Sequence, residues 1–182
     1  QLNWNVPDWI VLPGGNLGNT SAFGKAIKEA YEIGLIKKKP RLAIIQAKGA
    51  DPFYRLINGK QKSLESVIPD TIATAIKIGN PVSWKKAKEA IVETNGVVEE
   101  LSDDDILEAK AYVDAAGIGA EPASCCSVGG AKKLNDKGVI KKNDFVIAIL
   151  TGSMLKDPET TVKYHTGGFG KFKMCNRPIS LD

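Results

Sequence analysis

The stretch Trp9-Ile-Val-Leu-Pro13 followed by Gly14-Gly-Asn-Leu-Gly-Asn19 predicts a buried strand, a glycine-rich turn and the start of a helix. Glycine permits positive φ angles and lets a ligand approach the backbone closely. The free N–H groups of such a turn, and of the first helical turn, point toward an anion. The side chains of Asn16 and Asn19 add polar groups that a plain turn does not need. The loop is therefore a candidate phosphate site, although the same pattern also fits a turn without a ligand.

Apolar residues in the rest of the chain alternate between strand-like runs and helical spacing. The strand–helix–strand unit at the start should be parallel and right-handed. The residues from Ser102 to Asp105 resemble a capping box that begins a helix. We therefore expect an α/β fold of three layers, in which helices flank a mainly parallel sheet. The pattern predicts strands at 9–12, 42–45, 96–98 and 145–150, and helices at 23–31, 72–78, 84–91, 106–113 and 122–137. The apolar runs at 9–12, 42–45 and 145–150 predict strands that are buried on both faces.

Composition excludes several classes of function. The chain has 182 residues, of which 43% are hydrophobic, so it is long enough for one globular domain with a core. Its 25 basic and 21 acidic side chains leave a net charge of only +4, and no aromatic residues are interleaved with the lysine clusters, which argues against nucleic-acid binding. No apolar run reaches membrane-spanning length, and we expect no signal peptide. We expect a cytoplasmic protein that binds neither nucleic acid nor a membrane.

The cysteine and histidine residues give no pattern of a metal site. Cys125 and Cys126 are adjacent, so they lack metal-ligand spacing, and Cys175 stands far from both. His165 is the only histidine and has no cluster of cysteine or carboxylate residues around it. We therefore expect neither a disulfide framework nor a bound metal ion.

Ligands of open α/β sheets gather at the carboxyl ends of the strands, and three segments fall there. They are the loop 14–19, the segment 151–153 after the last strand, and the segment 121–124 before a helix. Thr151 is a candidate partner for a heteroatom of a ligand ring, or else a cap or turn residue. Glu121 is a candidate site carboxylate, or else complements a helix dipole. The loop departs from the dinucleotide spacing and lacks the Walker lysine, so a single phosphate on a compact cofactor suits it better.

Four stretches carry a resemblance to a known family. They are V-P-D-W-I-V-L-P-G-G-N-L-G-N at 6–19, T-I-A-T-A-I-K-I-G-N-P at 71–81, E-P-A-S at 121–124 and L-T-G-S-M-L-K-D-P at 150–158. In this order they resemble the threonine synthases, which are pyridoxal-phosphate enzymes of fold type II. The resemblance implies conversion of O-phosphohomoserine and water to threonine and phosphate, with pyridoxal 5′-phosphate as cofactor. Alternatives are another type II lyase, such as a threonine or serine dehydratase, and a phosphate-binding module without catalysis.

The resemblance also implies roles for individual residues. Residues 15–19 would cradle the cofactor phosphate, and Gly14 would complete the turn. Thr151 would bond the pyridine nitrogen, and Glu121 would lie near the ring. The implied cofactor-binding residues are Gly14, Gly15, Asn16, Leu17, Gly18, Asn19, Glu121 and Thr151.

The family's Schiff-base lysine, in an S-F-K-D-R context, has no counterpart in this chain, so no catalytic residue is assigned. We therefore expect the C-terminal portion of such an enzyme, inactive by itself. Residues 1–165 would form part of the cofactor domain, and residues 166–182 a peripheral tail. The expected partners are the N-terminal portion of the enzyme and a second copy, in a dimer.

Overall fold

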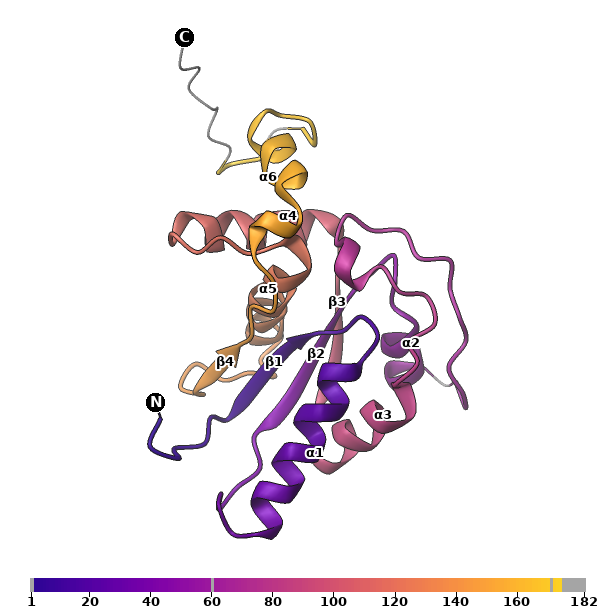
Figure 1. Ribbon diagram of the computed structural model, residues 1–182, viewed down its shortest axis with the longest axis vertical. Helices are drawn as coiled ribbons and strands as arrows, with labels where there is room; N and C mark the ends of the chain where they lie inside the picture. The colour runs from indigo at the N-terminus through magenta and orange to yellow at the C-terminus, as the bar shows by residue number, and fades with distance from the viewer. Residues whose placement is uncertain (1, 60, 171, 175–182) are drawn as a thin grey trace.

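The computed structural model describes residues 2–59, 61–170 and 172–174, and its regular elements alternate between strands and helices (Figure 1). The prediction of an α/β chain is confirmed. In chain order the elements are β1 (Trp9–Pro13), α1 (Gly18–Glu32), β2 (Arg41–Ala47), α2 (Pro52–Asn58), the 3-10 turn η1 (Thr74–Ile76), α3 (Trp84–Glu93), β3 (Val97–Leu101), α4 (Asp103–Ala115), α5 (Pro122–Asp136), β4 (Val146–Ala148), the 3-10 turn η2 (Met154–Lys156) and α6 (Pro158–His165).

The four strands of the described chain form one parallel sheet in the order β3-β2-β1-β4. Helices α1, α2 and α3 lie on one face, and α4 and α5 lie on the other (Figure 1). Val11 and Ile45 point toward α4 and α5, whereas Leu12 and Ile44 point toward α1, α2 and α3. This alternation buries both faces of the sheet, as the apolar runs of β1 and β2 predict.

Two local predictions are wrong. The run 145–150 is not a strongly buried strand: β4 is short and half-buried, because it lies at the edge of the sheet and pairs only with β1 within the described chain. The apolar residues 72–78 form only the turn η1 rather than a helix. The carboxylate of Asp103 accepts bonds from Thr71 Oγ1 and the amide of Ile72, which holds this segment in an irregular conformation.

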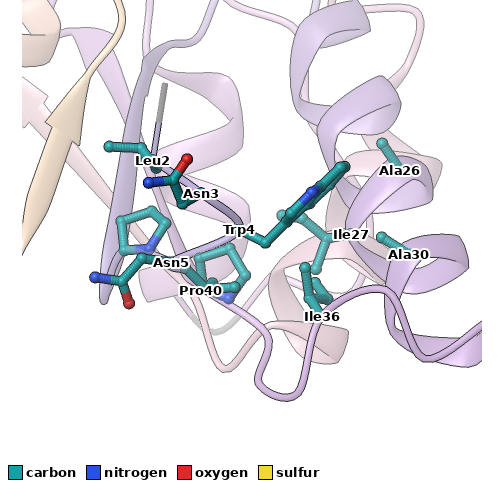
Figure 2. Close-up of a pocket in the computed structure, with 11 residues that line it drawn as sticks. Leu2, Asn3, Trp4, Asn5, Ala26, Ile27, Ala30, Ile36 and Pro40 are labelled. Atoms are coloured by element: carbon teal, nitrogen blue, oxygen red, sulfur yellow. The ribbon is translucent and has the colours of Figure 1, made fainter.

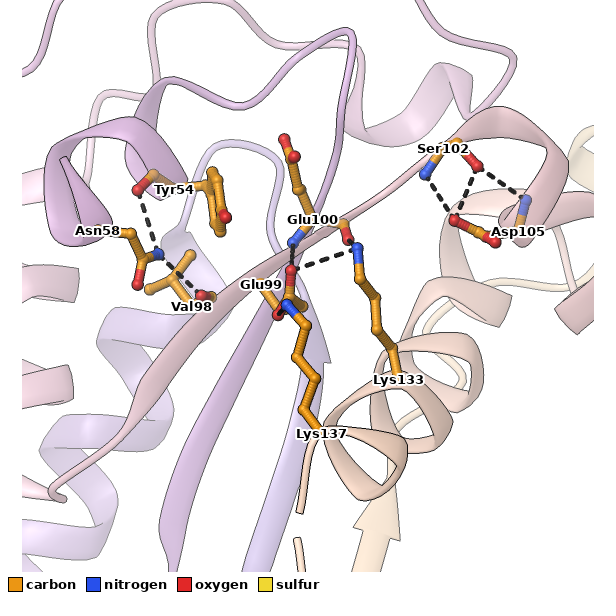
Figure 3. Close-up of polar contacts among 9 residues, drawn as sticks. All are labelled: Tyr54, Asn58, Val98, Glu99, Glu100, Ser102, Asp105, Lys133 and Lys137. Carbon is orange, nitrogen blue, oxygen red and sulfur yellow. Dashed lines mark hydrogen bonds and ion pairs between the residues drawn. The ribbon is translucent and has the colours of Figure 1, made fainter. Parts of the chain in front are cut away.

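Side-chain contacts fix the ends of β3 and its neighbours. The predicted capping box of α4 is confirmed: Ser102 accepts from the amide of Asp105, whose carboxylate accepts from the amide of Ser102. Buried Glu99 pairs with Lys133 at 3.4 Å and with Lys137 at 2.5 Å (Figure 3). Burial by itself raises the pKa of Glu99, but the bonds from Lys137 and the amide of Glu100, with the nearby lysine charges, leave it below its ordinary value.

An apolar groove lies at the amino ends of the strands, opposite the carboxyl edge. Leu2, Trp4, Ile27, Ala30 and Ile36 are among the residues that line it (Figure 2). It lies next to the segment that precedes β1 and the segment between α1 and β2, so it is remote from the sequence-predicted site.

The chain after α6 packs against α4 as far as it is described. Phe172 stacks on Tyr164 with 5.0 Å between the ring centroids. Phe169 and Met174 contact the same small cluster, which includes Leu107 of α4. Cys175 and the rest of 175–182 lie outside the described residues. None of the helices in the described ranges is long and apolar enough to cross a bilayer.

Candidate functional site

The sheet topology brings two sequence-predicted segments to one edge. β1 and β4 are parallel neighbours, with Val11 beside Ala148, so the loop after β1 and the segment 149–152 leave the same carboxyl edge. The chain runs from β1 outward to β2 and β3, then returns to place β4 on the other side of β1. Such a change of direction is where open α/β sheets bind ligands.

The loop presents a run of free backbone donors. The amides of residues 15–20 have no acceptor in the part of the chain that the structure describes. The first amide of α1 that is bonded is that of Ser21, which donates to the carbonyl of Leu17 at 3.1 Å. Gly14 differs, because its amide donates to the carbonyl of Ile45 at 2.7 Å. The available donors therefore begin at Gly15 and continue into the first turn of the helix, where the helix dipole favours an anion.

Close packing explains two of the loop glycines. A Cβ atom on Gly14 would lie 2.6 Å from Ile44 Cγ2, and one on Gly15 would lie 3.1 Å from the carbonyl oxygen of Ala75. A Cβ on Gly18 would meet nothing within 4 Å, so open space lies beside the helix start. Gly14, Gly15 and Gly18 do not use the positive φ that glycine permits: the left-handed residue of the loop is Leu17, at φ 63°.

The two loop asparagines differ in their contacts. Asn16 Oδ1 accepts from the amide of Val82 at 2.8 Å, and the Asn16 carbonyl accepts from Ser83 at 3.3 Å. Asn16 therefore ties the loop to the segment before α3. Asn19 is exposed in the first turn of α1, and its side chain bonds to none of the described residues.

Gln46 supports the loop from below and was not predicted as a site residue. Its fully buried side chain donates to the carbonyl of Gly14 at 3.1 Å and accepts from the amides of Phe53 and Tyr54, both at 2.9 Å. It therefore joins the loop to the first turn of α2. In the sequence, the signal that could have identified this residue is its polar side chain, directly after the apolar run 42–45.

Thr20 carries a buried hydroxyl that has no partner among the described residues. The residue lies in the first turn of α1, and its own amide is the last of the free amides of residues 15–20. A buried hydroxyl without a bond costs free energy, and sites that take ligands are places where such groups occur. The Thr20 hydroxyl therefore lies next to the free backbone amides, and a ligand that brings polar atoms to this site would give it a partner.

A second cluster joins the start of α5 to the segment after β4. Thr151 Oγ1 lies 3.0 Å from Ser124 Oγ, and the amide of Gly152 donates to the same Ser124 oxygen at 2.7 Å. Glu121 is buried, and its amide donates to the carbonyl of Gly152 at 3.1 Å. A Cβ on Gly152 would lie 2.0 Å from Glu121 Oε1, so a larger residue at this position would displace the Glu121 carboxylate. Thr151 itself is exposed at the edge of the sheet.

The structure therefore brings Glu121 and Thr151 together through Ser124, the last residue of the predicted segment 121–124, to which the sequence analysis gave no role. Ser124 is three residues after Glu121 on α5, and its side chain is fully buried. Its place in the E-P-A-S stretch was the available signal in the sequence. Backbone donors at the helix start suit a phosphate ester, and the Thr151 hydroxyl suits one polar atom of a ring.

Comparison with known proteins finds relatives that match most of this chain. Among curated proteins, the threonine synthase of Methanosarcina acetivorans is 44% identical over 184 residues, covering 100% of this chain and 43% of that protein. The threonine synthase of Methanocaldococcus jannaschii is 42% identical over 168 residues, covering 90% of this chain and 41% of that protein. The chain thus spans less than half the length of these relatives.

Solved structures show the same fold. Threonine synthase from Escherichia coli superposes with a TM-score of 0.66 at 16% identity, covering 100% of this chain and 38% of that chain. A fungal L-serine ammonia-lyase from Rhizomucor miehei also gives 0.66, at 20% identity, covering 90% of this chain and 52% of that chain. The family described as "Pyridoxal-phosphate dependent enzyme" matches residues 1–152. The chain therefore belongs to the family of pyridoxal-phosphate-dependent enzymes.

Proposed function

We propose that this chain supplies the phosphate cradle and the ring-nitrogen contact of a pyridoxal-phosphate-dependent threonine synthase. That enzyme would convert O-phosphohomoserine and water to threonine and phosphate. The observation that carries the proposal is the run of free amides at residues 15–20, at the sheet edge that also holds Thr151. Curated relatives named threonine synthase at 42% and 44% identity favour this substrate over the serine or threonine of a dehydratase.

The residues of the chain divide the work of holding the cofactor. The amides from Gly15 to Asn19 would donate to the phosphate oxygens, helped by the dipole of α1. The open space beside Gly18 and the unpartnered hydroxyl of Thr20 fit this use. Thr151 would bond the ring nitrogen, and buried Glu121 would keep the segment after β4 in place through Gly152. The cofactor, when bound, supplies an electron sink for the proton shifts of the substrate.

The remaining assignments are part of the same proposal. Residues 1–165 would belong to the cofactor domain and residues 166–182 to a peripheral tail. The rest of the enzyme would supply the lysine that binds the cofactor covalently. We further propose a homodimer, a cytoplasmic location and O-phosphohomoserine as the small-molecule substrate.

A negative charge introduced at the start of α1 tests whether the loop binds a phosphate. Gly18→Asp places a carboxylate in the open space beside the helix start, and Gly18→Asn is the neutral control of equal size. An acidic residue in the first helical turn favours folding, so a loss of binding reports on the ligand rather than on stability. We expect the aspartate variant to bind pyridoxine 5′-phosphate at least about tenfold more weakly than the asparagine variant, from repulsion between like charges. Equal affinities of the two variants would refute the cradle.

The reaction is tested on the full-length enzyme. Release of inorganic phosphate and threonine from O-phosphohomoserine is the expected result. Formation of oxobutyrate from threonine, without phosphate release from O-phosphohomoserine, would instead identify a dehydratase. Binding of pyridoxine 5′-phosphate with neither activity would identify a phosphate-binding module without catalysis.

A further inference from the structure

Residues 71–77, which include the turn η1, form a wall beside the phosphate loop. A Cβ atom on Gly15 would lie 3.1 Å from the carbonyl oxygen of Ala75 and 3.2 Å from Cα of Ile76. Gly15 is also the residue at which the free amides of the loop begin. The first donor of the proposed cradle therefore packs directly against this wall, and the position of the wall limits how the loop can lie.

Asp103 anchors the wall from a different element. Its carboxylate, at the start of α4, accepts from Thr71 Oγ1 at 2.5 Å and from the amide of Ile72 at 3.1 Å, each through a different oxygen. Thr71 Oγ1 in turn accepts from the amide of Ala73 at 3.2 Å, which extends the anchor to the residue just before η1. A carboxylate makes stronger hydrogen bonds than a neutral acceptor, so this anchor is a firm one.

The wall has no other polar anchor in the described chain. All its remaining hydrogen bonds there join residues 71–77 to neighbours within 70–78. Ala73 and Ile76 pack in the core, but apolar contacts have no preferred direction. They hold the wall against the core without fixing its distance from Gly15. That distance therefore depends on the bonds to Asp103.

We propose that Asp103 is a positioning residue of the phosphate site, which sets the place of Gly15 through the wall. The inference rests on the proposed function, because it takes the amides from Gly15 onward as donors to the cofactor phosphate. Asp103 acts at a distance: its carboxylate holds the wall, and η1 holds the loop. Without the anchor the wall can move away, and the loop then has more conformations to lose when it binds the phosphate.

The test measures the affinity of the full-length apoprotein for pyridoxine 5′-phosphate, which has no aldehyde and so forms no covalent adduct with lysines. Asp103→Asn keeps the size of the side chain but leaves only one acceptor oxygen. Asp104→Asn is the matched control, because Asp104 lies in the same helical turn, is exposed, and bonds none of the described residues. Thr71→Val removes the other partner of the bond, and Thr71→Ser keeps the hydroxyl. Urea unfolding of each variant shows that it is folded where binding is measured.

We expect Asp103→Asn and Thr71→Val each to weaken binding by about three- to tenfold, the usual effect of one hydrogen bond. Thr71→Ser should retain the affinity, because its hydroxyl can still donate to Asp103. Asp104→Asn should change the affinity by less than about twofold, since it removes the same charge from the helix start without touching the wall.

A double variant tests the route through the wall. The Cβ atom of Gly15→Ala would meet Ala75 and Ile76 more closely than an ordinary contact, so we expect this change to weaken binding by about tenfold while the wall is anchored. In the Asp103→Asn background the wall can give way, so Gly15→Ala should then weaken binding by only about threefold. If Asp103 served the stability of the fold alone, the two losses would multiply in full.

Unchanged affinity in both Asp103→Asn and Thr71→Val would overturn the inference, as would losses that multiply in full in the double variant. Equal losses in Asp104→Asn and Asp103→Asn would assign the effect to charge at the start of α4 and would overturn it too. Where Gly15→Ala binds too weakly to measure, the comparison of Thr71→Val with Thr71→Ser decides, and equal affinities of these two refute the inference. If the unaltered protein does not bind pyridoxine 5′-phosphate, the proposed function itself fails, and the inference fails with it.

Discussion

Gln46→Leu tests how the core supports the phosphate loop. The substitution keeps the volume of the side chain but leaves three backbone groups without their partner: the carbonyl of Gly14 and the amides of Phe53 and Tyr54. Gly14 and Phe53 are buried, whereas Tyr54 is half-buried, so water can replace only the last of these bonds. Each buried polar group left unpaired costs about 1 to 3 kcal/mol.

The free energy of unfolding should therefore fall by about 3 kcal/mol, a large part of the roughly 5 to 15 kcal/mol that holds an ordinary domain together. Urea unfolding followed by tryptophan fluorescence measures this change, and hydrogen exchange should accelerate at the amides of Phe53 and Tyr54. Gln61→Leu is the matched control: among the described residues Gln61 donates to exposed Glu65, and its buried Oε1 accepts no bond, so the substitution should cost less than about 0.5 kcal/mol. A loss below about 1 kcal/mol for Gln46→Leu would refute the view that this side chain holds the loop.

Three further results are expected. Thr20→Val removes the unpartnered hydroxyl and should stabilise the ligand-free protein by about 1 kcal/mol in urea unfolding, whereas a loss of that size would show that the hydroxyl has a partner. The lowered pKa of Glu99 contributes stability that is present above the ordinary glutamate pKa and is lost as the pH falls through the lowered value. The free energy of unfolding should therefore decrease as the pH falls through this range, and Glu99→Gln should make that decrease smaller. An equal decrease in both proteins would contradict the ion pair with Lys137. Burial raises the pKa of the Cys125 thiol to about 12 and that of Cys126 further still, so neither should react with a thiol reagent at pH 8 until the protein unfolds, and rapid labelling of either in the folded protein would contradict their burial.

The sequence alone determined the class of fold and the main candidate site. The run Trp9 to Pro13, the glycine-rich loop and the helix start are recognisable because their signals lie within a few consecutive residues. The capping box from Ser102 to Asp105 and the start of α5 at Pro122 are equally local, and both occur as predicted. Alternating strands and helices then require a parallel sheet, because each crossover returns the chain in the same direction.

Only the tertiary structure decided the features that depend on distant contacts. The segment 72–78 is apolar enough for a helix, yet bonds to Asp103, about thirty residues further along the chain, keep it irregular. The run 145–150 is apolar enough for a central strand, but its place in the strand order leaves it at the edge. Gln46 bonds Gly14, and Ser124 contacts Thr151 and Gly152. These partners are far away in the sequence, so no periodicity reveals the pairs. Spacing along the chain sets which elements form, whereas the packing of the sheet sets which side chains meet.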